Sequence, residues 1–134
     1  MDKIKLSDFQ MLNQRLIRTE FEVNKNLVLK NENNIKLDIH TDLRINKNEK
    51  DRQAIVTLTL KIFDKEKNTE CPFYIILENE GRFSWSANLK DVNNYLEINA
   101  PSILISYLRS VVSQLTSFAG FPPLILPLIN FTKE

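Results

Sequence analysis

The chain has 134 residues, 43% hydrophobic and 26% charged, which suits one folded domain over residues 1–134 and is too short for two. Eighteen basic and 17 acidic residues leave a formal net charge of +1. This balance excludes a strongly basic nucleic-acid-binding surface and any strong attraction to a membrane. The single cysteine, Cys71, excludes a disulfide framework and favours a reducing compartment.

No segment of the sequence is predicted to enter a membrane. Residues 1–8 lack the apolar core of a signal peptide. The apolar stretch 103–112 contains Ser106 and Arg109, and the stretch 121–131 contains three prolines. Both fall short of the ~18–20 apolar residues that a spanning helix needs. We therefore expect a soluble cytoplasmic protein.

Three segments, 13–23, 35–45 and 54–63, alternate between apolar and polar residues. Such a period of two predicts antiparallel strands with one buried and one wet face. Polar loops rich in asparagine and lysine separate the segments, so the three strands are predicted to follow one another as a meander. The apolar positions are Ile17, Phe21 and Val23, then Ile35, Leu37, Ile39, Leu43 and Ile45, then Val56, Leu58, Leu60 and Ile62.

A fourth predicted strand, 73–77, is apolar on both of its faces. One face would cover the same core as its neighbours, which leaves Tyr74 and Ile76 in water. An exposed apolar stripe on a soluble protein usually marks an interface. Tyr74, Ile76 and the following Glu78 are therefore the predicted subunit contact. The alternative is a strand buried on both faces at the centre of a monomer.

The pattern changes to a helical period after Trp85. A short helix is predicted over 89–97, capped by Ser86 or Asn88. Pro101 would break this helix or start a new one. Residues 102–119 form the strongest predicted helix, with apolar residues at steps of three and four: Leu104, Leu108, Val111, Leu115 and Phe118.

Gly120 stands where the C-terminal cap of the long helix belongs. The prolines that follow predict an extended segment over 121–131. This segment either packs over the edge of the core or lines a groove for an extended apolar polypeptide. Strands followed by helices indicate an α+β fold, a four-stranded antiparallel sheet with two helices packed on one face.

The sequence contains no recognisable catalytic or cofactor motif. His40, the only histidine, lies among charged neighbours on the polar side of its strand. Cys71 would need a nearby base and an electropositive setting to act as a nucleophile. One cysteine and one histidine do not make a closed zinc site. We therefore expect no enzyme, no cofactor and no metal site.

Several motifs resemble the protein-export chaperone SecB family. Residues 100–109, Ala-Pro-Ser-Ile-Leu-Ile-Ser-Tyr-Leu-Arg, resemble the family stretch C-P-N-x-L-F-P-Y-A-R-E, and residues 120–131 resemble G-x-F-P-x-L-x-L-x-P-x-N-F. Weaker similarity lies in 81–84 and in 35–39. The resemblance extends from about Gln14 to Phe131.

The resemblance implies a dimer of dimers that binds unfolded preproteins in apolar grooves and delivers them to the SecA motor ATPase. It implies no enzymatic activity, and it assigns the loop 25–34 to the crossover loop that shapes the groove. The client-groove residues expected on this basis are Leu27, Val28, Leu29, Phe121, Leu124, Leu126, Leu128 and Phe131.

Some features depart from the family pattern. Of the two carboxylates expected on the first strand for SecA contact, Glu20 is present, but Asn24 takes the second position, with Glu22 nearby. The chain is also near neutral and ends at Lys133-Glu134, without the family's further helix and tail. Three hypotheses follow: an export chaperone, a SecB-like chaperone of a toxin–antitoxin system, and a structural oligomer that kept the fold without client binding.

Overall fold

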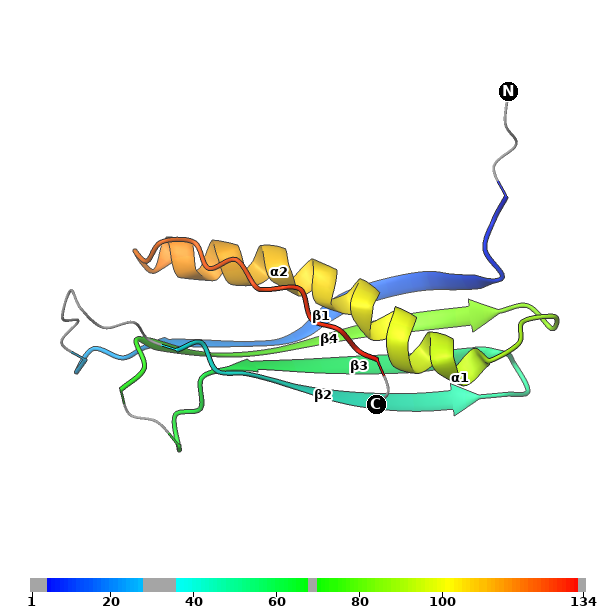
Figure 1. The fold of residues 1–134 in the computed structure, drawn as a ribbon, viewed down its shortest axis with the longest axis horizontal. Helices are drawn as coiled ribbons and strands as arrows, with labels where there is room; N and C mark the ends of the chain where they lie inside the picture. The colour runs from blue at the N-terminus through cyan, green and yellow to red at the C-terminus, as the bar shows by residue number, and fades with distance from the viewer. Residues whose placement is uncertain (1–4, 28–35, 68–69, 133–134) are drawn as a thin grey trace, which may run out of the picture.

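A four-stranded antiparallel sheet lies under one long helical segment and an extended C-terminal segment (Figure 1). The structure, a computed structural model, describes residues 5–27, 36–67 and 70–132. The helical segment covers one face of the sheet, here called the helix-side face, and leaves the other, the open face, uncovered. The strands are β1 (Phe9–Val23), β2 (Ile39–Asn48), β3 (Gln53–Ile62) and β4 (Phe73–Trp85).

The strands are ordered β1-β4-β3-β2, so β1 and β2 are the two edges of the sheet. The predicted meander of the first three strands is wrong, because β1 pairs with β4 along its length, from Phe9 opposite Trp85 to Val23 opposite Phe73. Only β2, β3 and β4 follow one another as hairpins. The connection over 24–38 is long enough to place β1 and β2 at opposite edges, which a tight hairpin could not do.

The alternation predicted for the third strand is confirmed. Every second residue of β3, from Ala54 to Ile62, is buried, and the residues between them are half-buried. Strand β4 continues the same alternation far beyond its predicted end at Leu77, as far as Trp85. The side chains that point to the helix-side face form the core together with the helix. Burial of their apolar area is the main source of the fold's stability.

Strand β1 does not keep a single parity. Register shifts between Met11 and Asn13 and between Leu16 and Arg18 each insert one extra residue relative to β4. Ile17 falls in the second irregularity and lies outside the paired register. It therefore does not share one regular face with Phe21, as its spacing had predicted, because a bulge shifts the side-chain alternation by one position.

The two predicted helices form one helical segment. A short α1 (Val92–Asn94) leads into the π-helical turn η1 (Tyr95–Asn99), and α2 (Ala100–Phe118) follows directly. Pro101 lies in the first turn of α2, directly after the π-helical turn, and the helical segment continues through it. The helix begins after Asp91, so Ser86 and Asn88 are not its cap. Among the described residues, no helix has the length and apolar character to cross a membrane.

The predicted cap at Gly120 is confirmed. Gly120 has a φ of 88°, in the left-handed region that glycine adopts without strain. Its N–H donates to the carbonyl of Ser117 and the N–H of Phe121 donates to the carbonyl of Thr116, both at 3.0 Å. This pair of bonds is a Schellman motif, which ends the helix and turns the chain back along it (Figure 1).

Candidate functional site

The C-terminal segment, residues 121–131, runs extended along α2 and is fixed to the helix at two points (Figure 1). The Oγ1 of Thr116 accepts a hydrogen bond from the N–H of Leu124 at 2.9 Å. The guanidinium of Arg109 donates to the carbonyl of Pro127 at 2.8 Å. The ring of Phe121 packs on the ring of Phe73, with centroids 5.2 Å apart.

The structure places the predicted groove residues at different depths. Leu126 is 2% exposed and belongs to the core, whereas Leu128 is 88% exposed and points away from it. Half-buried positions are taken by Leu27, Phe121, Leu124 and Phe131. Val28 and Leu29 lie outside the described residues.

A set of half-buried apolar side chains packs against the core from two elements. We call it the apolar strip. Its members combine a contact with the core and a surface still open to solvent, so a further apolar segment would gain burial there. They come from β2 with its approach and from the C-terminal segment: Leu37, Ile39, Leu43, Ile45, Phe121, Leu124, Ile129 and Phe131.

The edge strand β1 exposes four large apolar side chains. Leu12, Leu16, Ile17 and Val23 are 50%, 42%, 45% and 37% exposed. An edge strand also has backbone N–H and C=O groups free to pair with another strand. The predicted alternation had assigned Ile17 and Val23 to the buried face, so their exposure corrects that prediction. It had not singled out Leu12 or Leu16.

The predicted subunit contact lies at the centre of the sheet. Strand β4 is paired on both sides, with β1 and with β3, so its edges are not available. Tyr74, Ile76 and Glu78 point to the open face and are half-buried. Glu78 lies 3.8 Å from Arg18 and 3.7 Å from Arg44.

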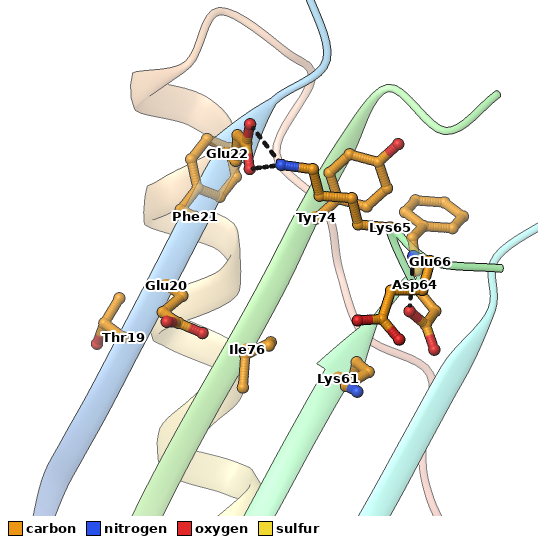
Figure 2. Close-up of a pocket in the computed structure, with 11 residues that line it drawn as sticks. Thr19, Glu20, Phe21, Glu22, Lys61, Asp64, Lys65, Glu66, Tyr74 and Ile76 are labelled. Carbon is orange, nitrogen blue, oxygen red and sulfur yellow. Dashed lines mark hydrogen bonds and ion pairs between the residues drawn. The ribbon is translucent and has the colours of Figure 1, made fainter. Parts of the chain in front are cut away.

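A cavity of about 560 Å³ opens on this same face, between the ends of β1 and β4 and the loop that follows β3 (Figure 2). The ammonium of Lys65 reaches over Tyr74 to the carboxylate of Glu22, at 2.9 Å. This hydrogen bond and the charge of Glu22 raise the pKa of Lys65. Glu20 pairs with Arg18 at 2.7 Å. Each carboxylate predicted to contact SecA is thus matched by a cation.

Cys71 and His40 are the side chains named in the sequence analysis as candidates for reactivity. Cys71 is fully buried. Burial is the largest cause that raises the pKa of its thiol, and the charges of Asp38 and Glu70 raise this pKa further. His40 pairs with Asp38, its Nε2 lying 3.0 Å from a carboxylate oxygen. Within residues 5–27, 36–67 and 70–132, no three His, Cys, Asp or Glu side chains gather as a metal site would require.

Sequence comparison identifies relatives in one family. Residues 6–133 match the family described as preprotein translocase subunit SecB. The protein-export protein SecB of Jannaschia is 31% identical over 94% of this chain and 77% of its own length. An uncharacterized protein of Methanocaldococcus jannaschii is 34% identical over 72% of this chain. This match spans 62% of the archaeal protein, and a match to SecB of Anaplasma phagocytophilum spans 27% of that protein.

The fold has solved counterparts. A SecB-like chaperone of Mycobacterium tuberculosis, solved with a ChAD peptide from the HigA1 antitoxin, superposes with a TM-score of 0.72 at 19% identity. The superposition covers 91% of both chains. A protein of unknown function from Streptococcus agalactiae gives a TM-score of 0.52 at 14% identity, over 89% of this chain and 96% of its own. Because the family match covers nearly the whole sequence, the chain belongs to the SecB family.

Proposed function

We propose that the protein is a molecular chaperone without enzymatic activity, which holds unfolded polypeptides on the apolar strip. The observation that carries this proposal is the strip itself: apolar side chains of β2 and of the C-terminal segment that are half-buried against the core and still partly open to solvent. An unfolded client exposes apolar side chains and gains about 25 cal/mol for each Å² of apolar area that it buries there. Such binding requires little sequence specificity.

The proposed chaperone acts as an oligomer, and β1 is the best-supported contact. Its free edge offers backbone hydrogen bonds, and Leu12, Leu16 and Ile17 offer apolar area. A second contact is α2, whose exposed residues are uncharged and include Tyr107 and Phe118, 41% and 88% exposed. One contact through each surface would build a dimer of dimers. The open-face contact through Tyr74 and Ile76 remains the competing prediction.

The natural client is either a preprotein awaiting export or the antitoxin of a toxin–antitoxin system. Delivery to SecA would need an acidic docking surface on the open face, but Glu20 and Glu22 are paired with Arg18 and Lys65. This pairing favours the antitoxin client, and so does the solved SecB-like neighbour that holds an antitoxin peptide. Both clients place the protein in the cytoplasm.

The test is binding to an unfolded model client, reduced and carboxymethylated α-lactalbumin, by fluorescence anisotropy. Wild-type protein is expected to bind it and to slow the aggregation of a denatured enzyme. Ile45→Thr removes apolar area from the strip and is expected to weaken binding severalfold. Ile55→Thr makes the same change at a half-buried position of β3 that points to the open face, and is the control. A folded wild-type protein that neither binds the client nor slows aggregation would refute the proposal.

Recovery of native partners from cells distinguishes the two client classes. Co-purification of SecA together with presecretory proteins would support the export function. Recovery of one antitoxin, with loss of that antitoxin in cells that lack this protein, would support the toxin–antitoxin function. If the protein still binds α-lactalbumin but recovers neither SecA with presecretory proteins nor an antitoxin, both client assignments are contradicted.

A further inference from the structure

Strand β2 is an edge of the sheet and pairs with its neighbour without irregularity (Figure 1). Its register against β3 is unbroken from Ile39, opposite Ile62, to Asn48, opposite Gln53. The other edge strand, β1, is interrupted by two register shifts. Because bulges disturb the ladder of backbone hydrogen bonds, the unbroken edge of β2 is the better template for a further strand.

The hydrogen bonds around β2 determine which of its backbone groups point outward. The N–H of Phe63 donates to the carbonyl of Asp38 at 2.9 Å, and this pair continues the register of β2 and β3. Hydrogen-bonded pairs alternate with non-bonded pairs along an antiparallel ladder. The even-numbered residues of β2 therefore bond to β3, and the odd-numbered residues direct their N–H and C=O groups to the free edge. The bond from the N–H of Trp85 to the carbonyl of Arg52, at 3.2 Å, agrees, because it assigns the even-numbered residues of β3 to β4 and leaves the odd-numbered ones for β2.

The outward backbone groups and the apolar strip belong to the same residues. Odd-numbered side chains of β2 point to the helix-side face, because their partners in β3 are the buried residues of that strand. Ile39, Leu43 and Ile45 are thus members of the strip that also offer free backbone groups. Two residues that exchange hydrogen bonds across an antiparallel pair have side chains on the same face. A chain bonded to β2 would place every second side chain on the strip and the others beside exposed polar residues such as Asp42 and Arg44.

Hydrogen bonds at this edge meet a requirement that apolar contact alone does not. Each residue of an unfolded client brings a C=O group and, unless it is proline, an N–H group, and burying these groups without partners costs free energy. The free groups of residues 39–45 supply such partners beside the strip. Lys47 ends the apolar part of the edge, because its half-buried side chain directs an ammonium to Asn93 at 2.9 Å and to Glu49 at 3.1 Å.

We infer that an extended segment of the client adds to β2 as a fifth, antiparallel strand, with every second side chain on the apolar strip. The inference rests on the proposed chaperone function and says how the client is held. Every strand pairing that the structure describes in this sheet is antiparallel, and this direction is also the more stable per residue. The backbone bonds accept many sequences, while the strip favours clients whose apolar residues recur at every second position.

Peptide binding to unmutated protein tests the added strand. The probe is a fluorescent peptide in which valine alternates with threonine between terminal lysines, and anisotropy measures its affinity. With the valines on the strip, their N–H groups would bond to β2, while the N–H groups of the threonines would point away. N-methylation of two central valines is expected to weaken binding about tenfold or more. N-methylation of two central threonines, the matched control, is expected to weaken it by no more than about twofold.

A substitution in β2 tests whether the peptide lies along this edge. Thr41 is exposed, and its N–H points to the free edge, so proline there removes a donor that β3 does not use. Thr41→Pro is expected to bind the unmethylated peptide about three- to tenfold more weakly, because one hydrogen bond is lost and the ring occupies space beside the edge. Thr41→Ser keeps the N–H and is expected to bind as wild type does.

Failure of the added strand and failure of the chaperone function are distinguishable. Wild-type protein that binds neither carboxymethylated α-lactalbumin nor the peptide contradicts the proposed function. Wild-type protein that binds α-lactalbumin overturns the added strand alone if it does not bind the peptide, binds all its forms equally, or loses more affinity when the threonines are methylated.

The Thr41→Pro variant has outcomes of its own. Peptide binding as tight as that of wild type would overturn the added strand. A smaller oligomer in sedimentation velocity would assign the β2 edge to a contact between copies of the chain, and would also overturn it. If circular dichroism shows that Thr41→Pro has lost its fold, the comparison of the methylated peptides on wild-type protein decides the question.

Discussion

Replacing Gly81 with alanine places a methyl group where the helix and the sheet come closest. Gly81 lies in β4 opposite Gln14 of β1 and Val56 of β3, and it faces the helix. A Cβ at this position would lie 2.7 Å from the ring of Phe83 and 2.8 Å from a methyl group of Leu104. Both distances are shorter than side-chain atoms tolerate, so one of the two side chains must move.

The cost of this substitution follows from where the obstructing atoms lie. Phe83 and Leu104 are both fully buried, and they have no solvent into which to turn. Overpacking of a close-packed core costs about 1–3 kcal/mol. For a domain of this size, each kcal/mol lowers the melting temperature by about 3–4 °C. We therefore expect Gly81→Ala to melt about 3–12 °C below wild type.

Thermal unfolding followed by circular dichroism measures the effect, and the second glycine provides a contrasting control. A Cβ at Gly120 would meet no atom within 4 Å, but its φ of 88° disfavours alanine. Gly120→Ala is expected to cost ~1 kcal/mol, and Gly120→Asn less, because asparagine accepts the left-handed region. At Gly81 asparagine is expected to destabilise the protein more than alanine does, because the space for a side chain is limiting there.

Gly81→Ala as stable as wild type would refute this reasoning, because it would show that the helix does not approach the sheet as closely as the structure has it. A smaller loss for asparagine than for alanine at both glycines would also contradict it. That result would mean that backbone conformation limits Gly81 and Gly120 alike.

Three further outcomes are expected. Leu126→Ala should lower the stability by ~2–3 kcal/mol, near the lower end for a buried leucine, while Leu128→Ala should leave the melting temperature unchanged. Cys71 should resist alkylation by iodoacetamide at pH 8 until urea is added, because burial excludes the reagent and its raised pKa keeps the thiol protonated; rapid labelling of folded protein would contradict this. Ile17→Glu should reduce the oligomer seen by sedimentation velocity, whereas Ile76→Glu should not; the reverse result would favour the open face as the subunit contact.

Strand β3 was predictable because its pattern is local: each alternate side chain from Val56 to Ile62 is apolar and buried. Strand β4 was predicted only as far as Leu77, because the inward positions that follow are Asn79 and Gly81. The bulges of the edge strand β1 were not predictable from the sequence. Its bulges exist only relative to β4, more than fifty residues further along the chain, and no property of residues 9–23 taken alone specifies them.

The two predicted helices merged for a similar reason. Pro101 predicts a break in the helix when the sequence is considered alone, yet the helical segment continues through it. The preceding turn is a π-helix, which no simple periodicity indicates. In contrast, Gly120 was predicted correctly because a Schellman cap depends on residues next to one another in the chain.

The candidate site was predictable in composition and not in geometry. The apolar, proline-broken segment 121–131 was recognised, but a strict alternation would have placed Leu124, Leu126 and Leu128 on one side. Instead the inward positions step from Leu126 to Ile129 across Pro127, whose carbonyl is fixed by Arg109. That contact joins residues on two elements, and sequence spacing carries no information about it.

The two faces of the sheet differ in a way that separates holding a client from delivering it. The helix-side margin is apolar, while the open face carries acidic residues that are matched by cations: Glu20 by Arg18, Glu22 by Lys65 and Glu80 by Arg15. Exposed ion pairs add little stability, so their main effect is on the field that a partner meets. A basic partner docking there would have to displace Arg18 and Lys65. The apolar strip requires no such exchange, so the proposed holding of a client does not depend on SecA docking.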